Sequence, residues 1–311
     1  MTFEIIVPNR YHMLTSVHAW IYPDVQPVPE QTSRTGIHRL YHFDDEPVPI
    51  ILHQCTQGDP ITVDFSSQSV TEDEIRNKIV QTLGLDVNMK SALKKIRMDE
   101  KLAKIYHGVA GIQPYQSPSI FEALVKTIIQ QQVSYRAANV LTRRMILSIG
   151  PKMSFKDLTL YSFPTPKEIE RCSIRELQSF GFGYKAEYIH GIATSAVNGS
   201  LDLESFREKT HLEVKSILLP IHGIGLWTVR TLAIAGLGDF SIFPVGDLGI
   251  RNLLGRLFND GERMSVREVE AITGRWGEDW PLVFYLIMCA DVLGLFEEVG
   301  RQQTHKRRSR K

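Results

Sequence analysis

The chain contains little cysteine. Only three cysteines occur among its 311 residues, at Cys55, Cys172 and Cys289, and none belongs to a C-x-x-C pair. Disulfide frameworks, zinc sites and iron–sulfur clusters need more numerous or more closely spaced cysteines. The spacing argues against such sites. We therefore expect a reducing, cytoplasmic setting and neither a metal nor another cofactor.

Long apolar runs and an excess of one charge are also missing. No stretch approaches the ~18 consecutive apolar residues of a membrane span, so we expect no membrane partner. The first residues, MTFEIIVPNRYH, lack the basic-then-apolar layout of a signal peptide. The formal net charge is only +1. A nucleic acid could therefore bind only through a local patch, not through a global positive field.

The first part of the chain has the composition of short β-strands. β-branched and aromatic residues gather in four segments, separated by turn formers: 3–8, 36–43, 48–53 and 61–65. Thr71 followed by Glu72, Asp73 and Glu74 has the form of an N-cap with an acidic first turn, which predicts a helix. We expect residues 1–88 to form an antiparallel sheet domain with one or more helices.

From about residue 90 onward, no convincing strand is predicted. Apolar residues recur at spacings of three and four, typical of helices, over 119–129, 135–149, 174–180, 185–197, 211–219, 227–237, 248–258, 266–276 and 281–295. The predicted fold is α+β: an antiparallel sheet domain followed by an all-α domain over residues 89–300. Residues 301–311 end in the basic run HKRRSRK, which we expect to be disordered.

The segment LLPIHGIGLWT, residues 218–228, predicts a tight turn between two helices. Gly223 and Gly225 bracket one apolar residue, so the backbone can turn without a Cβ in the way. N–H groups of the turn and of the next helix can then bind a phosphate oxygen, helped by the helix dipole. A plain helix–turn–helix corner with glycine caps is the alternative interpretation.

A second motif, FPVGDLGIR, follows over residues 243–251. Its Asp247 lies 22 residues beyond Gly225, after a Pro-x-Gly turn and before an apolar helix. By itself this position is typical of a helix N-cap.

Together the two motifs resemble the signature of the helix–hairpin–helix superfamily of base-excision DNA glycosylases, in which a Gly/Pro-rich loop after the hairpin ends in an essential Asp. The pattern is most similar to the 3-methyladenine DNA glycosylase II (AlkA) type. A third match, FEALVKTIIQQQVS over residues 121–134, resembles the family helix and the loop that enters DNA where the base leaves. The resemblance covers about residues 118–295, and an N-terminal sheet domain also suits this type.

The resemblance implies a monomer that binds double-stranded DNA containing damaged bases. Extruding a base from the stack leaves a vacancy that must be held open. The family pattern places Gln132 there, with Gln131 close behind; a polar helix end on the surface is the alternative. The other DNA-binding positions that it implies flank this loop or lie in the hairpin: Ser134, His222, Gly223, Ile224, Gly225 and Thr228.

Asp247 is the catalytic residue that the resemblance implies. Cleavage of the N-glycosidic bond builds positive charge on the sugar, which a nearby carboxylate stabilises while it orients water. Superfamily members that also nick DNA carry a Lys two residues after the second hairpin Gly, and that amine forms a Schiff base with the sugar. Trp227 occupies this position. We therefore expect a monofunctional glycosylase of base excision repair without lyase activity.

Alkylated purines such as 3-methyladenine and 7-methylguanine are the expected substrates. They carry positive charge, which the aromatic face of Trp227 attracts. Trp227 packing between the hairpin helices is the alternative and is compatible with that role. Tyr285 is predicted to line the same pocket, whereas Asp291 is interpreted as the surface end of an amphipathic helix.

Two other functions remain in competition. An oxidised-purine or mismatch glycosylase is disfavoured by Trp227 in place of Lys and by the lack of a C-terminal four-cysteine cluster. A non-catalytic helix–hairpin–helix module that only binds damaged DNA would need no carboxylate at position 247.

Overall fold

A five-stranded antiparallel sheet forms the first part of the computed structural model, which describes residues 1–296 except 45 and 244. The strand order is β1-β5-β4-β3-β2. The strands are β1 (Thr2–Ile5), β2 (Gln31–Thr32), β3 (Gly36–Phe43), β4 (Glu46–His53) and β5 (Ile61–Phe65). Three of the four predicted segments match strands closely, and the first overlaps β1. The sequence pattern missed β2, which is only two residues long.

Two helices cover the apolar face of this sheet: α1 (Met13–His18) and α2 (Glu72–Thr82). Thr71 caps α2 in a capping box with Glu74, as its sequence predicts. Ile75 and Ile79 of α2 are fully buried against the strand residues Ile50 and Val63. The sheet domain therefore has a hydrophobic core of its own.

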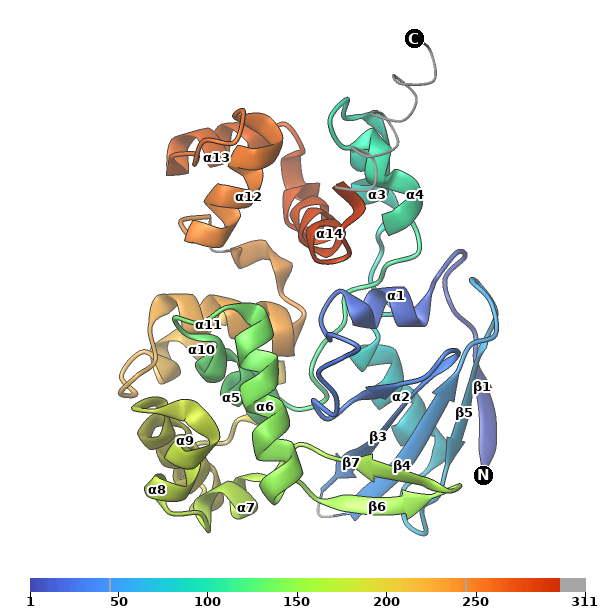
Figure 1. Ribbon diagram of the computed structural model, residues 1–311, viewed down its shortest axis with the longest axis vertical. Coiled ribbons are helices and arrows are strands. Elements are labelled where there is room, and N and C mark those ends of the chain that lie inside the picture. The colour runs from blue at the N-terminus through green and yellow to red at the C-terminus, as the bar shows by residue number, and fades with distance from the viewer. Residues whose placement is uncertain (45, 244, 297–311) are drawn as a thin grey trace.

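The rest of the described chain is mainly helical (Figure 1). Its helices are α3 (Lys90–Met98), α4 (Tyr106–Val109), α5 (Ile120–Gln130), α6 (Tyr135–Ile149), α7 (Pro166–Glu170), α8 (Ile174–Leu177), α9 (Lys185–Val197), α10 (His211–Leu218), α11 (Leu226–Leu232), α12 (Leu248–Phe258), α13 (Val266–Gly274) and α14 (Trp280–Val292). The predicted α+β class and the order of its two parts are confirmed. Within the described part of the chain, no helix is long and apolar enough to cross a membrane. The basic residues 301–311 lie outside the described residues.

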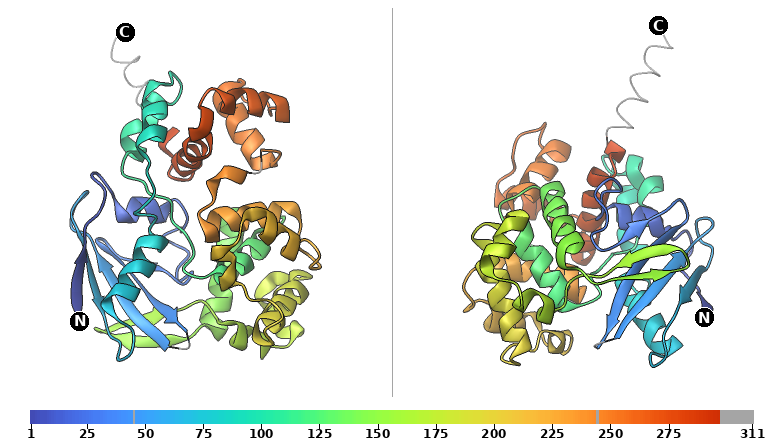
Figure 2. Two further views of the ribbon diagram at one scale, coloured as in Figure 1. Left: turned by 180° about the vertical axis from the view of Figure 1, so that it is seen from behind. Right: turned by 60° about the horizontal axis from the view of Figure 1, so that its bottom comes forward.

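The expectation of no strand after residue 90 is wrong. β6 (Lys152–Phe155) and β7 (Leu158–Tyr161) form an antiparallel hairpin that lies against the N-terminal sheet (Figure 2). Its two turn residues, Lys156 and Asp157, both have positive φ. A Lys-Asp pair lacks the Asn-Gly signature that marks such turns in a sequence. Burial of Leu160 between Leu40 and Ile51 of the sheet explains why the hairpin forms here.

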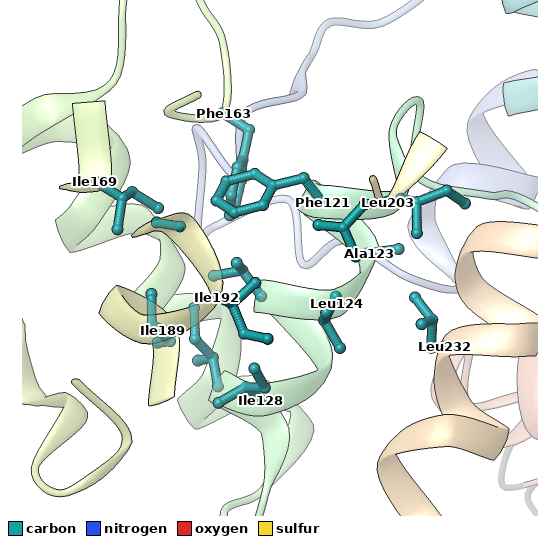
Figure 3. Close-up of a cluster of buried hydrophobic side chains, with 14 of the residues drawn as sticks. Phe121, Ala123, Leu124, Ile128, Phe163, Ile169, Ile189, Ile192, Leu203 and Leu232 are labelled. Atoms are coloured by element: carbon teal, nitrogen blue, oxygen red, sulfur yellow. The ribbon is translucent and has the colours of Figure 1, made fainter. Parts of the chain in front are cut away.

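Two hydrophobic clusters hold the helical part together. One surrounds α5, which is buried on nearly all sides and packs against Ile189 and Ile192 of α9 and Leu232 of α11 (Figure 3). The other joins α3 and α4 to α12, α13 and α14, so that residues 89–112 pack with residues 234–290. The segment after α11 crosses from the first cluster to the second, and this crossing positions the site.

Candidate active site

The predicted hairpin joins α10 to α11. Gly223 has a φ of +87°, and a Cβ there would lie 2.3 Å from the ring of Tyr188. Both features require glycine. Gly225 is the N-cap of α11 and faces open space. Because glycine has no side chain to accept hydrogen bonds, it leaves the first-turn N–H groups of α11 to an external acceptor such as a phosphate oxygen.

Other predicted hairpin residues have more limited roles. His222 is exposed, and its ring lies edge-on to Tyr188 with centroids 4.9 Å apart. Ile224 is buried, and its N–H donates to the carbonyl of Ile221. The Ile224 side chain therefore stabilises the turn from inside, so a DNA contact by this side chain is not available, and a contact through its backbone stays a prediction. The Thr228 side chain is also buried, which leaves only its backbone to face DNA.

Asp247 is both a helix cap and a cavity residue. Its Oδ1 accepts a hydrogen bond from the backbone N–H of Ile250 at 3.1 Å, which begins α12. Its Oδ2 accepts one from the indole N–H of Trp227 at 3.0 Å. The carboxylate is half-buried and lines a large cavity. The N-cap interpretation and the catalytic one therefore describe the same geometry, because the two hydrogen bonds hold both oxygens in fixed positions.

The cavity has a volume of about 1150 Å³ and lies where the sheet domain and the two helical clusters meet. Trp20, Trp227, Phe243 and Asp247 contribute to its wall. Sequence reasoning missed Trp20. It follows α1, more than 200 residues before Asp247, and no local pattern distinguishes it from a core aromatic.

Tyr285 does not line this cavity, which corrects the sequence prediction. Its side chain is fully buried and stacks on Trp20, with ring centroids 5.6 Å apart. The Tyr285 hydroxyl accepts hydrogen bonds from the Trp20 indole at 2.6 Å and from the Tyr115 backbone at 3.1 Å. Burial raises the pKa of the Tyr285 phenol well above its usual value. Tyr285 therefore supports the wall from behind as a neutral side chain.

The loop between α5 and α6 forms one edge of the cavity. Gln132 is exposed in a left-handed backbone conformation, with φ +57°, and its Oε1 accepts a hydrogen bond from the Tyr184 hydroxyl at 3.1 Å. The Gln131 amide points instead to the hairpin. Ser134 caps α6 by accepting a hydrogen bond from the N–H of Ala137. Of the two glutamines, Gln132 is thus the one available to enter DNA.

Asp291 lies at a helix end with a partly exposed side chain, as its sequence interpretation has it, but it also lines the cavity. α14 is apolar all round rather than amphipathic, and Asp291 lies in its last turn. Both carboxylate oxygens lie 2.8 Å from the guanidinium of Arg256 on α12. This ion pair adds charged groups to the cavity wall near α12, the helix that Asp247 caps.

A buried ionic cluster connects the sheet domain to α5, and one of its members, Lys126, lines the cavity. Arg39 of β3 forms ion pairs with Glu30 and Glu122, and Lys126 also pairs with Glu122. Burial alone would raise the pKa of Glu122, but Arg39 and Lys126 together hold it below its usual range. Among the described residues, no group of three His, Cys, Asp or Glu side chains is placed to hold a metal ion.

The fold and the hairpin define a helix–hairpin–helix protein with an aspartate at the wall of a large cavity. The family model described as "HhH-GPD superfamily base excision DNA repair protein" matches residues 125–278. The chain therefore carries a domain of the HhH-GPD superfamily, as its motifs indicate.

Known proteins resemble the chain beyond this domain. A DNA-3-methyladenine glycosylase of Bacillus subtilis is 25% identical over 217 residues, or 69% of this chain and 71% of that protein. A second B. subtilis protein, YfjP, is 28% identical over 176 residues, or 56% of this chain but only 60% of that protein. The structure of the 3-methyladenine DNA glycosylase from Archaeoglobus fulgidus has a TM-score of 0.81 and 26% identity, covering 92% of this chain and 97% of that one.

Proposed function

We propose that this protein is a DNA glycosylase of base excision repair that hydrolyses the N-glycosidic bond of alkylated purines extruded from double-stranded DNA. The observation that carries the proposal is the Asp247 carboxylate, held by the Trp227 and Ile250 N–H groups at the wall of a cavity large enough for a base. The resemblance to glycosylases of B. subtilis and A. fulgidus supports it.

DNA binding in this proposal starts at the hairpin. The first-turn N–H groups of α11 bind a backbone phosphate, with Gly225 allowing close approach. This contact carries no sequence information, as a repair enzyme that meets lesions in any context requires. Gln132 fills the space that the base leaves and can hydrogen-bond the orphaned partner base.

The chemical step relies on Asp247 and water. As the bond to the base breaks, the sugar gains positive charge, and the half-buried Asp247 carboxylate at the cavity wall stabilises it. The two hydrogen bonds to Asp247 fix its position before the reaction, so it need not reorganise. The carboxylate also orients the attacking water.

Trp227 supports two finer parts of the proposal. It occupies the position of the lysine in glycosylases that nick DNA, and an indole cannot form a Schiff base, so the enzyme should be monofunctional. Its ring and that of Trp20 both line the cavity, and aromatic faces attract cationic bases such as 3-methyladenine and 7-methylguanine. We further propose that the enzyme acts as a monomer in the cytoplasm, at the nucleoid.

A base-release assay on methylated duplex DNA tests the proposal. Wild-type protein should free methylated purines, and Asp247→Asn should lower the single-turnover rate by about 10²-fold or more, since it removes the charge but keeps the shape. If the wild type releases no base but binds damaged duplexes, the protein is the non-catalytic binding module instead. If Asp247→Asn releases base as fast as the wild type, the catalytic assignment is wrong.

A further inference from the structure

Gln131 is buried more deeply than its neighbour Gln132 and contacts a different part of the molecule. Its amide Nε2 lies 2.9 Å from the carbonyl oxygen of Gly223 and 3.0 Å from the hydroxyl oxygen of Thr228. A backbone carbonyl can only accept a hydrogen bond, so the NH₂ end of the amide must face it. Both hydrogens of this group are thus directed at the hairpin.

These two hydrogen bonds join segments that are distant in sequence. Gln131 directly precedes Gln132, whereas Gly223 and Thr228 lie in the turn and in the first turn of α11, more than 90 residues later. The Thr228 side chain is buried, so water competes little for its hydroxyl. Gly223 cannot shift toward α9, because the Tyr188 ring lies against it. The hairpin therefore offers Gln131 a rigid support.

The start of the loop is held as well. Lys185 of α9 is buried, and its ammonium group donates to the carbonyl of Ile129, in the last turn of α5, at 2.8 Å. A cation at this end of a helix also interacts favourably with the helix dipole. The chain is thus held at the backbone carbonyl of Ile129 and at the side chain of Gln131. Gln132, in its left-handed conformation, is the first exposed residue beyond both supports.

We infer that Gln131 is a positioning residue that makes the phosphate-binding hairpin and the DNA-entering Gln132 one mechanical unit. When the hairpin binds a phosphate, the position of Gln132 relative to the duplex is set through the Gln131 amide. Gln131 then contributes to holding the base out of the stack and little to initial binding. This inference rests on the proposed function, because it assumes that Gln132 enters DNA.

The test measures base extrusion and binding separately, on full-length protein. A duplex carrying 2-aminopurine beside a stable abasic-site analogue reports unstacking by its fluorescence, and anisotropy of a labelled undamaged duplex reports binding. Gln131→Met, which keeps the length but loses the donors, should lower the unstacking equilibrium about tenfold and change Kd for undamaged duplex less than twofold. Gln178→Met, at an exposed position where the short helical segment Gln178–Phe182 begins after α8, is the matched surface control.

Two further variants distinguish positioning from a general loss of structure. Thr228→Val removes one acceptor with little change in volume, and its effect on unstacking should not add to that of Gln131→Met. Gln131→Glu should be impaired at pH 8 and partly recover at pH 5, because only a protonated carboxyl can donate to the Gly223 carbonyl. Full additivity, or unstacking by Gln131→Met equal to wild type, would overturn the inference.

Base release by the wild type, measured on methylated duplex in parallel, keeps the two ideas apart. A wild type that unstacks 2-aminopurine but releases no base would contradict the proposed function and leave the role of Gln131 intact. If the wild type releases base but the Gln131→Met variant unstacks 2-aminopurine normally, the proposed function is supported and the role of Gln131 is contradicted.

Discussion

At the scale of the single residue, Trp227 and Asp247 act as a pair. The hydrogen bond between the indole N–H and the carboxylate means that replacing Trp227 changes two things at once: the aromatic face toward the cavity and the donor that orients Asp247. Sequence alone suggests only the first. The two contributions can be separated by substitution.

Trp227→Phe keeps an aromatic face but removes the N–H donor. We expect about a tenfold lower rate of base release, equal for cationic 7-methylguanine and neutral hypoxanthine, because the change acts on Asp247. Trp227→Ala should lose additional activity on the cationic base through the missing cation–π attraction. Single-turnover rates on both substrates measure this. Equal losses for Trp227→Ala on the two bases would remove the cation–π argument.

The same position predicts how the reaction ends. With Trp227 in place of an amine, we expect no covalent enzyme–sugar intermediate, and product DNA should retain an intact abasic strand. Borohydride added during turnover should trap no protein–DNA adduct, and strand cleavage should appear only after alkali. A trapped adduct on a denaturing gel would contradict the monofunctional assignment.

At the scale of the element, the hairpin shows why its two glycines are not equivalent. Gly223 combines positive φ with close contact to Tyr188, while Gly225 has ordinary extended geometry and open space around it. Glycine is required at position 223 because of packing against Tyr188, and at position 225 because a side chain there would restrict access to the N-terminus of α11. Their substitutions should therefore affect different properties.

Gly223→Ala should destabilise the protein by about 2 kcal/mol or more, since it adds backbone strain and a clash with the Tyr188 ring. Gly225→Ala should cost less than about 1 kcal/mol, as an unfavourable but unstrained N-cap. Urea unfolding of both variants measures the difference. Gly225→Asp should in addition weaken binding to damaged and undamaged duplexes alike, because it places a negative charge where we propose that a DNA phosphate binds. An equal loss of stability for the two alanine variants would show that the Tyr188 ring moves aside to accommodate the added methyl group, and would contradict the packing explanation for Gly223.

At the scale of the whole molecule, the sheet domain is part of the site and not an appendage. It provides Trp20 to the cavity wall, and its Arg39 lies between the buried carboxylates of Glu30 and Glu122, with Glu122 on the central helix α5. The β6–β7 hairpin reaches back from the helical part to cover Leu40 and Ile51 of the sheet. The two parts should therefore unfold together.

Arg39→Met tests this connection. Without the guanidinium, the buried carboxylates of Glu30 and Glu122 keep Lys126 and the Tyr115 hydroxyl near them but lose their shared cationic partner, and we expect a loss of about 3–5 kcal/mol of unfolding free energy at pH 7. In the wild type, the lowered pKa of Glu122 gives stability that is present above the usual carboxyl pKa of about 4.3 and is lost as pH falls further. In the variant Glu122 loses this cationic partner and should protonate at a higher pH than in the wild type. The difference in unfolding free energy should therefore narrow between pH 7 and pH 4.5, and a constant difference would argue against the charge explanation.

The sequence by itself determined the elements whose signals are local. Helix periodicity predicted α5, α6 and α9 almost to the residue, the glycine pair predicted the hairpin, and the Pro-x-Gly-Asp turn predicted the cap that Asp247 forms. These features follow from backbone conformation and hydrogen bonds within a few residues, so they can be read from a short stretch of sequence.

Only the tertiary structure decided which side chains meet. It placed Trp20 in the cavity wall and Tyr285 behind it, directed Gln131 to the hairpin and paired Asp291 with Arg256. It also produced the β6–β7 hairpin, whose turn carries no strong local signal. Each of these depends on burial or pairing between segments far apart in the chain. The free energy of such contacts belongs to the pair of surfaces and is not encoded in either segment alone.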